Sequence, residues 1–178
     1  GRRRCDLAAT HSDATLTTGA GGRRGFSTGG VTCVGTVSGA QAGTLAVDDG
    51  ITAGAGATWA FPGTGMEWTA DYPTAGTLTN TDVVRLTTAT GSRGVRNAGS
   101  VFRNEGTVEH TDTGSWFMFL GGRTENAASW TVTDAGDLFG SSGVGTFVNE
   151  AGATLTKSGA GTMSVSSGGL SVENAGTI

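Results

Sequence analysis

The sequence predicts an all-β protein, a β-solenoid of about seven to eight coils in a single domain, with no significant α-helix. Three observations support this prediction. A short phrase returns at intervals of 22 to 25 residues, the runs that follow it alternate polar and apolar residues, and glycine and threonine are abundant. A period of this size, built from a turn and a short strand, is typical of coils that stack on one another.

The recurring phrase consists of Asn, one or two small residues, Gly, and then Thr or Ser beside an aliphatic residue. Its copies begin at Asn104, Asn126, Asn149 and Asn174, which are 22, 23 and 25 residues apart, and the second copy lacks the glycine. Asn and Gly adopt positive φ angles more easily than other residues, so the phrase predicts the sharp turns of a coil. Asn residues at one position of neighbouring coils are expected to form a ladder of hydrogen-bonded amides.

Short strands are predicted after these turns. In residues 154–156 and 162–166, Thr, Ser or a charged residue alternates with an apolar one, which places one set of side chains inside the coil. The chain has 33 glycines and only two prolines, and no window carries the apolar spacing of an amphipathic helix. Regularly placed aliphatic residues and a net charge of only -4 argue against disorder.

The domain 1–178 is expected to contain three regions: one or more irregular N-terminal coils in 1–40, a loop insertion at 56–74, and regular repeats over 95–178. The first residue is not Met, and no segment resembles the apolar core of a signal peptide. We therefore expect either a piece of a longer protein or a processed subunit. No apolar stretch is long enough to predict a membrane span.

The C-terminal repeats resemble a known family. Residues 155–165 read Leu-Thr-Lys-Ser-Gly-Ala-Gly-Thr-Met-Ser-Val, and residues 168–178 continue with Gly-Gly-Leu-Ser-Val-Glu-Asn-Ala-Gly-Thr-Ile. This sequence resembles the autotransporter-associated β-strand repeat and the related adhesin-like β-helix proteins of bacterial surfaces. The resemblance implies a right-handed parallel β-helix in a secreted or cell-surface protein, with no catalytic residues to transfer.

The two cysteines predict a disulfide. Cys5 and Cys33 are 28 residues apart, about one coil plus a turn, so they can lie side by side on adjacent coils. Such a bond would stabilise the first coil and suit an oxidising compartment. The alternative is two unrelated buried thiols. Together with His11 and His110 the cysteines lack the spacing of a zinc site, and we predict no metal and no cofactor.

The charges are distributed unevenly along the chain. Residues 1–25 carry five arginines against two aspartates, a net of +3, whereas residues 101–178 carry three basic and eight acidic side chains, a net of -5. Ends of opposite sign favour head-to-tail docking of copies into a filament, although a solvated basic tail is the simpler interpretation. The candidate assembly contacts are Arg2, Arg3, Arg4, Arg23, Arg24, Glu173 and Ile178.

Aromatic residues supply a second candidate surface. The predicted loop 56–74 contains Trp59, Phe61, Trp68 and Tyr72, which could bind a sugar or a protein, or pack on the solenoid as a lid. Residues 116–120 form a continuous apolar run, which is typical of a strand covered on both faces.

Enzymatic activity is not expected. Acidic candidates for polysaccharide cleavage exist, but inverting hydrolysis needs two carboxyl groups that converge, and the sequence does not show that any two do. Those candidates are Asp48, Asp49, Asp71 and Asp82, with Arg85 nearby. Irregularly spaced Thr-x-Thr motifs disfavour ice binding, and the acidic balance disfavours nucleic acid as a partner.

These observations predict an extracellular structural protein, a subunit of a bacterial surface filament or matrix fibre assembled by head-to-tail stacking. An adhesin passenger segment that binds glycans or host and cell surfaces is the alternative, and a polysaccharide-degrading enzyme is a weaker one. The expected partners are other copies of the chain or the remainder of a longer surface protein, with polysaccharide as a further candidate.

Overall fold

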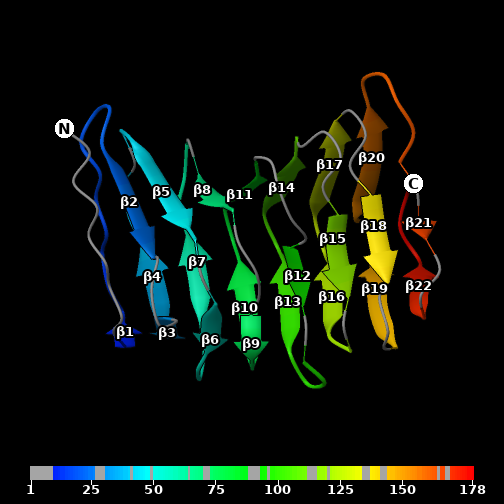
Figure 1. Ribbon diagram of the computed structural model, residues 1–178, viewed down its shortest axis with the longest axis horizontal. Helices are drawn as coiled ribbons and strands as arrows, with labels where there is room; N and C mark the ends of the chain where they lie inside the picture. Colours follow the sequence, from blue (N-terminus) through cyan, green and yellow to red (C-terminus); the bar gives the residue numbers. More distant parts are fainter. Residues whose placement is uncertain are drawn as a thin grey trace.

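The computed structural model describes residues 10–26, 31–40, 42–48, 50–63, 65–69, 73–87, 93–95, 97–111, 116–119, 121–133, 137–140, 144–163, 165–166 and 169–178. Every regular element in these residues is a β-strand, and all strand pairs are parallel. The strands stack along one axis as a β-solenoid, which confirms the predicted fold class (Figure 1). Within this part of the chain, no helix has the length and apolar character that crossing a membrane requires.

Three strands in each complete coil contribute to three faces. Sheet I contains seven strands: β4 (Thr36–Ser38), β7 (Thr58–Ala60), β10 (Thr77–Asn80), β13 (Val101–Asn104), β16 (Arg123–Asn126), β19 (Gly145–Asn149) and β22 (Leu170–Asn174). Sheet II also contains seven: β2 (Arg23–Phe26), β5 (Thr44–Val47), β8 (Met66–Trp68), β11 (Val83–Leu86), β14 (Thr107–His110), β17 (Ser129–Thr133) and β20 (Thr154–Ser158).

The third position of the coil is occupied by two four-stranded sheets, one in each half of the chain. The first contains β1 (Thr10–Ser12), β3 (Val31–Val34), β6 (Ile51–Ala53) and β9 (Pro73–Ala75), and the second contains β12 (Arg93–Val95), β15 (Trp116–Phe119), β18 (Asp137–Gly140) and β21 (Val165–Ser166). The apolar run at 116–120 thus contributes strand β15, and its last residue lies outside the described part.

The described residues form about six complete turns, from β3 to β20, which is fewer than the seven to eight predicted. Strands β1 and β2 before them, and β21 and β22 after them, belong to incomplete turns. The prediction was too high because it divided the whole chain length by the length of one coil.

The predicted loop insertion at 56–74 is wrong. This segment supplies β7 and β8 and the start of β9, so it is an ordinary part of the coil. Trp59 of β7 and Met66 and Trp68 of β8 face the interior of the solenoid, which is wide enough here to hold tryptophan rings. The cluster of aromatic residues in this segment belongs to the core and not to a protruding loop.

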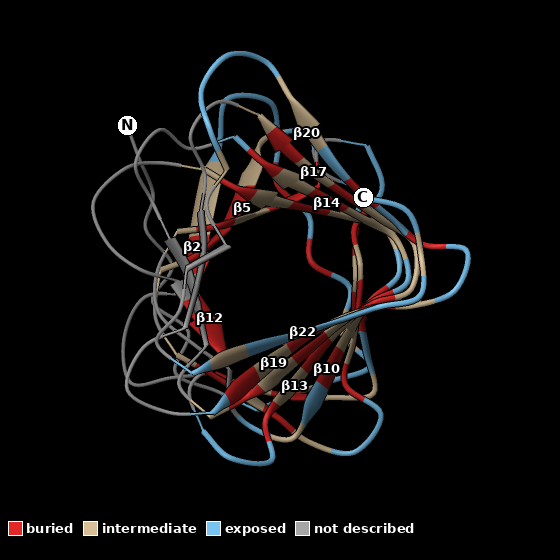
Figure 2. Cartoon of the chain, turned by 90° about the vertical axis from the view of Figure 1, so that its right-hand side faces the viewer, coloured by how far each residue is buried: buried red, intermediate tan, exposed pale blue. Residues whose placement is uncertain are grey.

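Strand alternation builds the core as columns of side chains that run along the axis. Seen along that axis, buried residues line the inside of the coil and exposed residues lie on the outside and in the turns (Figure 2). In sheet I one inward column contains Leu78, Phe102, Thr124, Phe147 and Val172, one residue from each of five successive strands. The columns keep the parallel register fixed, since a slip of one residue would turn the inward side chains outward.

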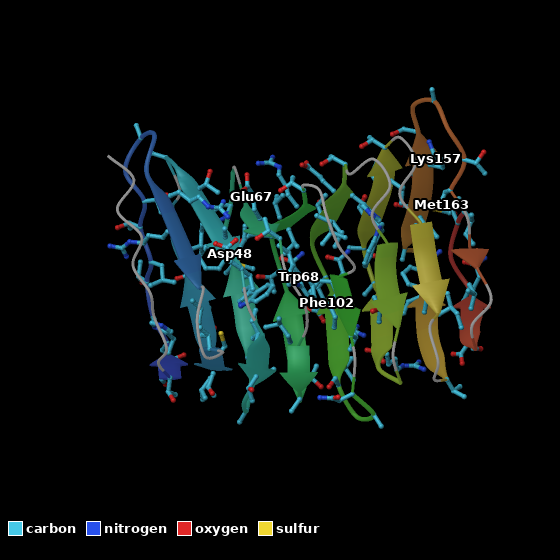
Figure 3. The ribbon with its side chains drawn as sticks, in the orientation of Figure 1. Asp48, Glu67, Trp68, Phe102, Lys157 and Met163 are labelled. Atoms are coloured by element: carbon cyan, nitrogen blue, oxygen red, sulfur yellow. The ribbon has the colours of Figure 1, made fainter. Side chains whose placement is uncertain are left out.

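Five aromatic rings form a chain of edge contacts through the interior. Their order is Trp59, Trp68, Phe102, Trp130 and Phe147, alternating between sheets I and II, with ring centroids 5.3 to 6.3 Å apart and planes 71° to 85° from parallel. All five side chains are buried, and Trp68 and Phe102 lie near the middle of the molecule (Figure 3). Each edge-to-face pair contributes about 0.5–1.5 kcal/mol to the stability of the fold, in addition to the contribution from burying its apolar area.

Candidate functional site

An asparagine ladder occupies the second inward column of sheet I. Asn80, Asn104, Asn126, Asn149 and Asn174 lie at one register position of five successive coils. Each Nδ2 donates to the Oδ1 of the next asparagine at 2.8 Å. The first four side chains are at most 1% exposed, so the amides find their partners in one another instead of in water.

The ladder also fixes the turn that leads from sheet I to sheet II. Asn104 Nδ2 donates a second hydrogen bond to the Ser129 carbonyl of the next coil at 2.9 Å, and the Gly106 amide donates to Asn104 Oδ1 at 3.3 Å. Asn126 and Asn149 make equivalent second bonds to Thr154 and Thr177. Each asparagine therefore holds its own turn and joins it to the following one.

Sequence reasoning identified four of these asparagines and missed Asn80. The turn after Asn80 contains Thr81 and Asp82 with no glycine, so the phrase is not recognisable there. The available signal was the interval of 24 residues to Asn104. Before Asn80 the same register position holds Trp59 and Val37, so the interior changes from apolar to amide within one coil.

A network of ion pairs crosses the outer face of sheet I and the turns beside it. The guanidinium of Arg103 contacts Glu105 at 2.8 Å, Glu125 at 3.0 Å and Glu150 at 2.5 Å. Hydrogen bonds to Glu150, Glu105 and Glu125 raise the pKa of Arg103 above its ordinary value. One side chain thus joins residues from three successive coils.

Arg123 extends this network toward the last coil. It contacts Glu125 at 2.8 Å and Glu173 at 3.7 Å. Burial raises the pKa of Glu125, but hydrogen bonds from Arg123 and Arg103 and their charges outweigh burial, and the net pKa is lowered. Glu125 is consequently held in its charged form.

A second group of charges lies on the outer face of sheet II. Arg23 contacts Asp48 at 2.6 Å and Glu67 at 3.3 Å, which brings carboxylates from β8 and from the residue after β5 to one guanidinium. Figure 3 shows Asp48 and Glu67 near each other along the axis. Thr69 also donates its hydroxyl to Asp48, and on the next strand Arg85 contacts Glu109 at 2.6 Å. These pairs tie successive coils of sheet II together.

Beside these charges the surface is hollowed where β2, β5 and β8 begin. The hollow has a volume of about 530 Å³. Its lining consists of Gly21, Gly22, Arg23, Ala42, Gly43, Thr44, Gly65, Glu67 and Arg85. It follows the solenoid axis across consecutive coils.

The predicted aromatic binding surface is wrong for the three of its four residues that the structure describes. Trp59, Phe61 and Trp68 are each at most 1% exposed and belong to the core, so they cannot contact a ligand. Tyr72 lies outside the described residues. The sequence showed an aromatic cluster but not which face of each strand the rings occupy.

The predicted disulfide is not seen. Cys33 is a free, buried thiol in β3, and Cys5 lies outside the described residues. Burial raises the pKa of the Cys33 thiol, and a hydrogen bond with Trp59 opposes this only partly. Cys33 therefore remains protonated at neutral pH and packs as a small apolar residue.

The predicted assembly contacts are divided between the two ends. Arg2, Arg3 and Arg4 lie outside the described residues, Arg23 is engaged with Asp48 and Glu67, and Arg24 is half-buried at the register position of Leu45. At the other end, Glu173 and Ile178 are exposed. Of the contacts that the structure describes, Glu173 and Ile178 are therefore exposed for docking, whereas Arg23 is already paired within the chain.

The last coil presents an open face. Val172 is 40% exposed and Ile178 is 67% exposed, although Phe147, in the column of Val172, is fully buried. Lys157 occupies an inward register position beside Val132, and its Nζ donates to the carbonyls of Ser158, Gly159 and Ala160. Lys157 and Met163 lie near this end of the rod (Figure 3).

Two of the four acidic candidates for catalysis lie in the described residues, and each of these two has another partner. Asp49 and Asp71 lie outside the described residues, Asp82 forms part of the turn after Asn80, and Asp48 is paired with Arg23. In the part of the chain that the structure describes, no group of three or more His, Cys, Asp or Glu side chains could hold a metal ion.

Comparison with protein-family models, with curated proteins and with solved structures finds no match for this chain. The resemblance of residues 155–178 to the autotransporter-associated repeat therefore stays a prediction. What the molecule does has to be argued from its own geometry.

Proposed function

We propose that the chain is an extracellular structural protein, a stiff β-solenoid rod that stacks head to tail in a bacterial surface filament or matrix fibre. The observation that carries this proposal is the open face of the last coil. There, positions that are buried in the preceding coils are exposed, and strand β22 has backbone groups along its outer edge. Such an edge is a template on which another strand pairs.

The change in exposure from one coil to the next supports stacking at this face. Phe147 and Asn149 are fully buried, whereas Val172 and Asn174, which occupy the same register positions one coil later, are exposed. The next coil of a stacked partner would bury Val172 and Ile178 together. Apolar area removed from water contributes about 25 cal/mol per Å².

The asparagine ladder would not continue across a joint between two identical chains. Thr15 pairs with Ser38, so Ala14 holds the register position of Val37 and of the ladder asparagines. A second copy stacked in register would thus place Ala14 beside Asn174. The joint is expected to rest on backbone pairing and on Val172 and Ile178, with no further asparagine partner.

Electron microscopy and sedimentation test the assembly. We expect thin filaments, or sedimentation that rises with concentration. Charges are screened beyond about 3 Å in about 1 M salt, so a joint made of backbone pairing and apolar contacts should persist there, and shortening of the filaments would indicate docking between charged ends instead. Isolated rods at every concentration would contradict self-stacking and favour the interpretation that the face is covered by the remainder of a longer surface protein.

A pair of valine variants locates the contact. Val172→Asp places a charge on the open face and is expected to abolish association. Val144→Asp is the matched control, because Val144 is 78% exposed just before β19 and therefore belongs to the coil before the last one. Equal association of both variants would show that the open face is not the contact.

The adhesin alternative loses the residues on which it depended, because Trp59, Phe61 and Trp68 are buried. A role in binding outside molecules now has to rest on another surface.

A further inference from the structure

The hollow on the outer face of sheet II has a floor of backbone. Four of its nine lining residues are glycines, and they precede β2, β5 and β8 in three consecutive coils. A Cβ at Gly43 would lie 2.2 Å from the Gly22 carbonyl oxygen, and one at Gly65, where φ is +68°, would lie 2.6 Å from the Val83 carbonyl oxygen. Close coil packing therefore keeps side chains off the floor at Gly43 and Gly65. Gly21 and Gly22 are exposed and Gly43 is partly exposed, so a ligand can approach the backbone at these three positions, whereas Gly65 is buried beneath them. We call this hollow the glycine groove.

The rim of the glycine groove carries hydrogen-bonding groups of both kinds. Arg23, Glu67 and Arg85 supply guanidinium donors and carboxylate acceptors. A guanidinium has five N–H donors, and the ion pairs of Arg23 with Asp48 and Glu67 use its Nη1 and Nη2 atoms. A carboxylate has about four lone-pair sites, so Glu67 can accept further hydrogen bonds in addition to the one from Arg23.

The pairing of these charges selects the chemical class of the ligand. A ligand carboxylate or phosphate would have to compete with Asp48 and Glu67 for Arg23, whereas a hydroxyl group both donates and accepts and can bridge a guanidinium and a carboxylate without separating them. Polyhydroxylated, uncharged molecules fit this rim better than anions do.

The direction of the groove selects the shape of the ligand. Neighbouring strands of a sheet are about 4.8 Å apart, and the groove crosses β2, β5 and β8 and reaches Arg85 on β11. The length of one pyranose unit in an extended β-1,4-linked chain is close to this spacing. Consecutive sugar units along the axis would therefore meet equivalent backbone positions of consecutive coils.

We propose that the glycine groove binds an extended, uncharged β-1,4-linked oligosaccharide. The sugar rings lie along the glycine backbone, and Arg23, Glu67 and Arg85 bind their hydroxyl groups. The proposal does not require end-to-end stacking, although β2, at one end of the groove, is also the end strand of sheet II beside which a stacked copy would lie.

Nuclear magnetic resonance of the ¹⁵N-labelled chain tests it, with cellohexaose, xylohexaose and mannohexaose as probes and hexagalacturonate as the acidic comparison. We expect at least one neutral hexasaccharide to shift the amide signals of Gly21, Gly22, Gly43 and Gly65, and to do so equally in about 1 M salt, where Coulomb attraction is screened. Failure of all three neutral probes to shift these signals would overturn the proposal, and so would tighter binding of hexagalacturonate.

Two matched substitutions test the location. Thr44→Trp fills the groove and is expected to weaken binding by about tenfold or more, a loss of about 1.4 kcal/mol. Thr107→Trp is the control, because Thr107 lies in the same register column two coils beyond Gly65 and outside the groove. Unchanged affinity in Thr44→Trp would place binding elsewhere.

A substitution on the rim of the glycine groove provides a second test in case Thr44→Trp disturbs folding. Glu67→Gln preserves shape and removes the charge, and is expected to weaken binding several-fold, while Glu105→Gln on the sheet I side leaves it unchanged. Equal affinities of these two variants would remove Glu67 from the site. None of the four substitutions touches the open face, so filament formation reports on the assembly separately.

Discussion

A buried asparagine is stable in this protein only because each of its polar groups has a partner. Asn126 donates to Asn149 and to the Thr154 carbonyl, and accepts from Asn104. An unpaired buried amide would cost about 1–3 kcal/mol, so the ladder stabilises the fold as a connected set and weakens when one member is lost.

Asn126→Ala is expected to lower the free energy of unfolding by about 3 kcal/mol, because it leaves groups on both neighbouring asparagines without partners in the interior. Asn174→Ala, at the exposed end of the ladder, should cost less than about 1 kcal/mol, since water can replace the missing oxygen. Urea denaturation of both variants measures the difference. Similar losses would show that the ladder adds little beyond packing.

Thr124 is the one polar residue in the otherwise apolar column of sheet I. Its side chain is fully buried between Phe102 and Phe147, and its hydroxyl has no hydrogen-bond partner in the structure. Thr124→Val keeps the shape and removes the buried hydroxyl, so it is expected to raise the unfolding free energy by about 1 kcal/mol. Thermal unfolding checks this, with the half-buried Thr146→Val on the outer face as the control. A loss of stability in Thr124→Val would contradict the expectation.

At the scale of the strand, charged pairs couple neighbouring coils on the outside as the asparagines do on the inside. Arg103 reaches residues of three successive coils through Glu105, Glu125 and Glu150. These side chains are partly exposed, so we assign the network about 1 kcal/mol in all.

The network makes stability depend on pH. The lowered pKa of Glu125 means that its contribution is complete above the ordinary value of 4.5 and is lost as the pH falls through the lowered value. We expect Arg103→Gln to reduce stability by about 1 kcal/mol at neutral pH and to lose less on acidification than the unmodified chain. Denaturation midpoints at pH 7 and pH 3 measure this. Glu105→Gln, which removes only one pair, should have a smaller effect, and an unchanged acid loss in Arg103→Gln would contradict the assignment.

Strand-scale patterns also explain how much the sequence could predict. Alternation and the asparagine interval are local and periodic, so they predicted the coil, the ladder position and the inward face of the later strands. The tryptophans of β7 and β8 were misplaced as loop residues because prolines and glycines surround them, and nothing local shows that the interior is wide enough for rings. The pairing of Arg23 with Asp48 and Glu67 joins residues 25 and 44 positions apart, which no short-range pattern reveals.

At the scale of the whole molecule, the rod has two kinds of interior. Toward the N-terminus the position next to the turn holds Val37 and Trp59, and from Asn80 onward it holds amides. The edge-to-face aromatic chain crosses this boundary, since it runs from Trp59 to Phe147. The two halves are therefore joined by packing at the point where the hydrogen-bonded ladder begins.

The ladder gives the rod a polarity. Every amide donates toward the C-terminal coil, so the side-chain dipoles point the same way along the axis and add together. At the C-terminal end of the rod this column finishes in the amide of Asn174, whereas in the first described coil the same register position holds Ala14. A fibre made of such rods would have chemically different tips, and new material would be expected to join at one tip faster than at the other.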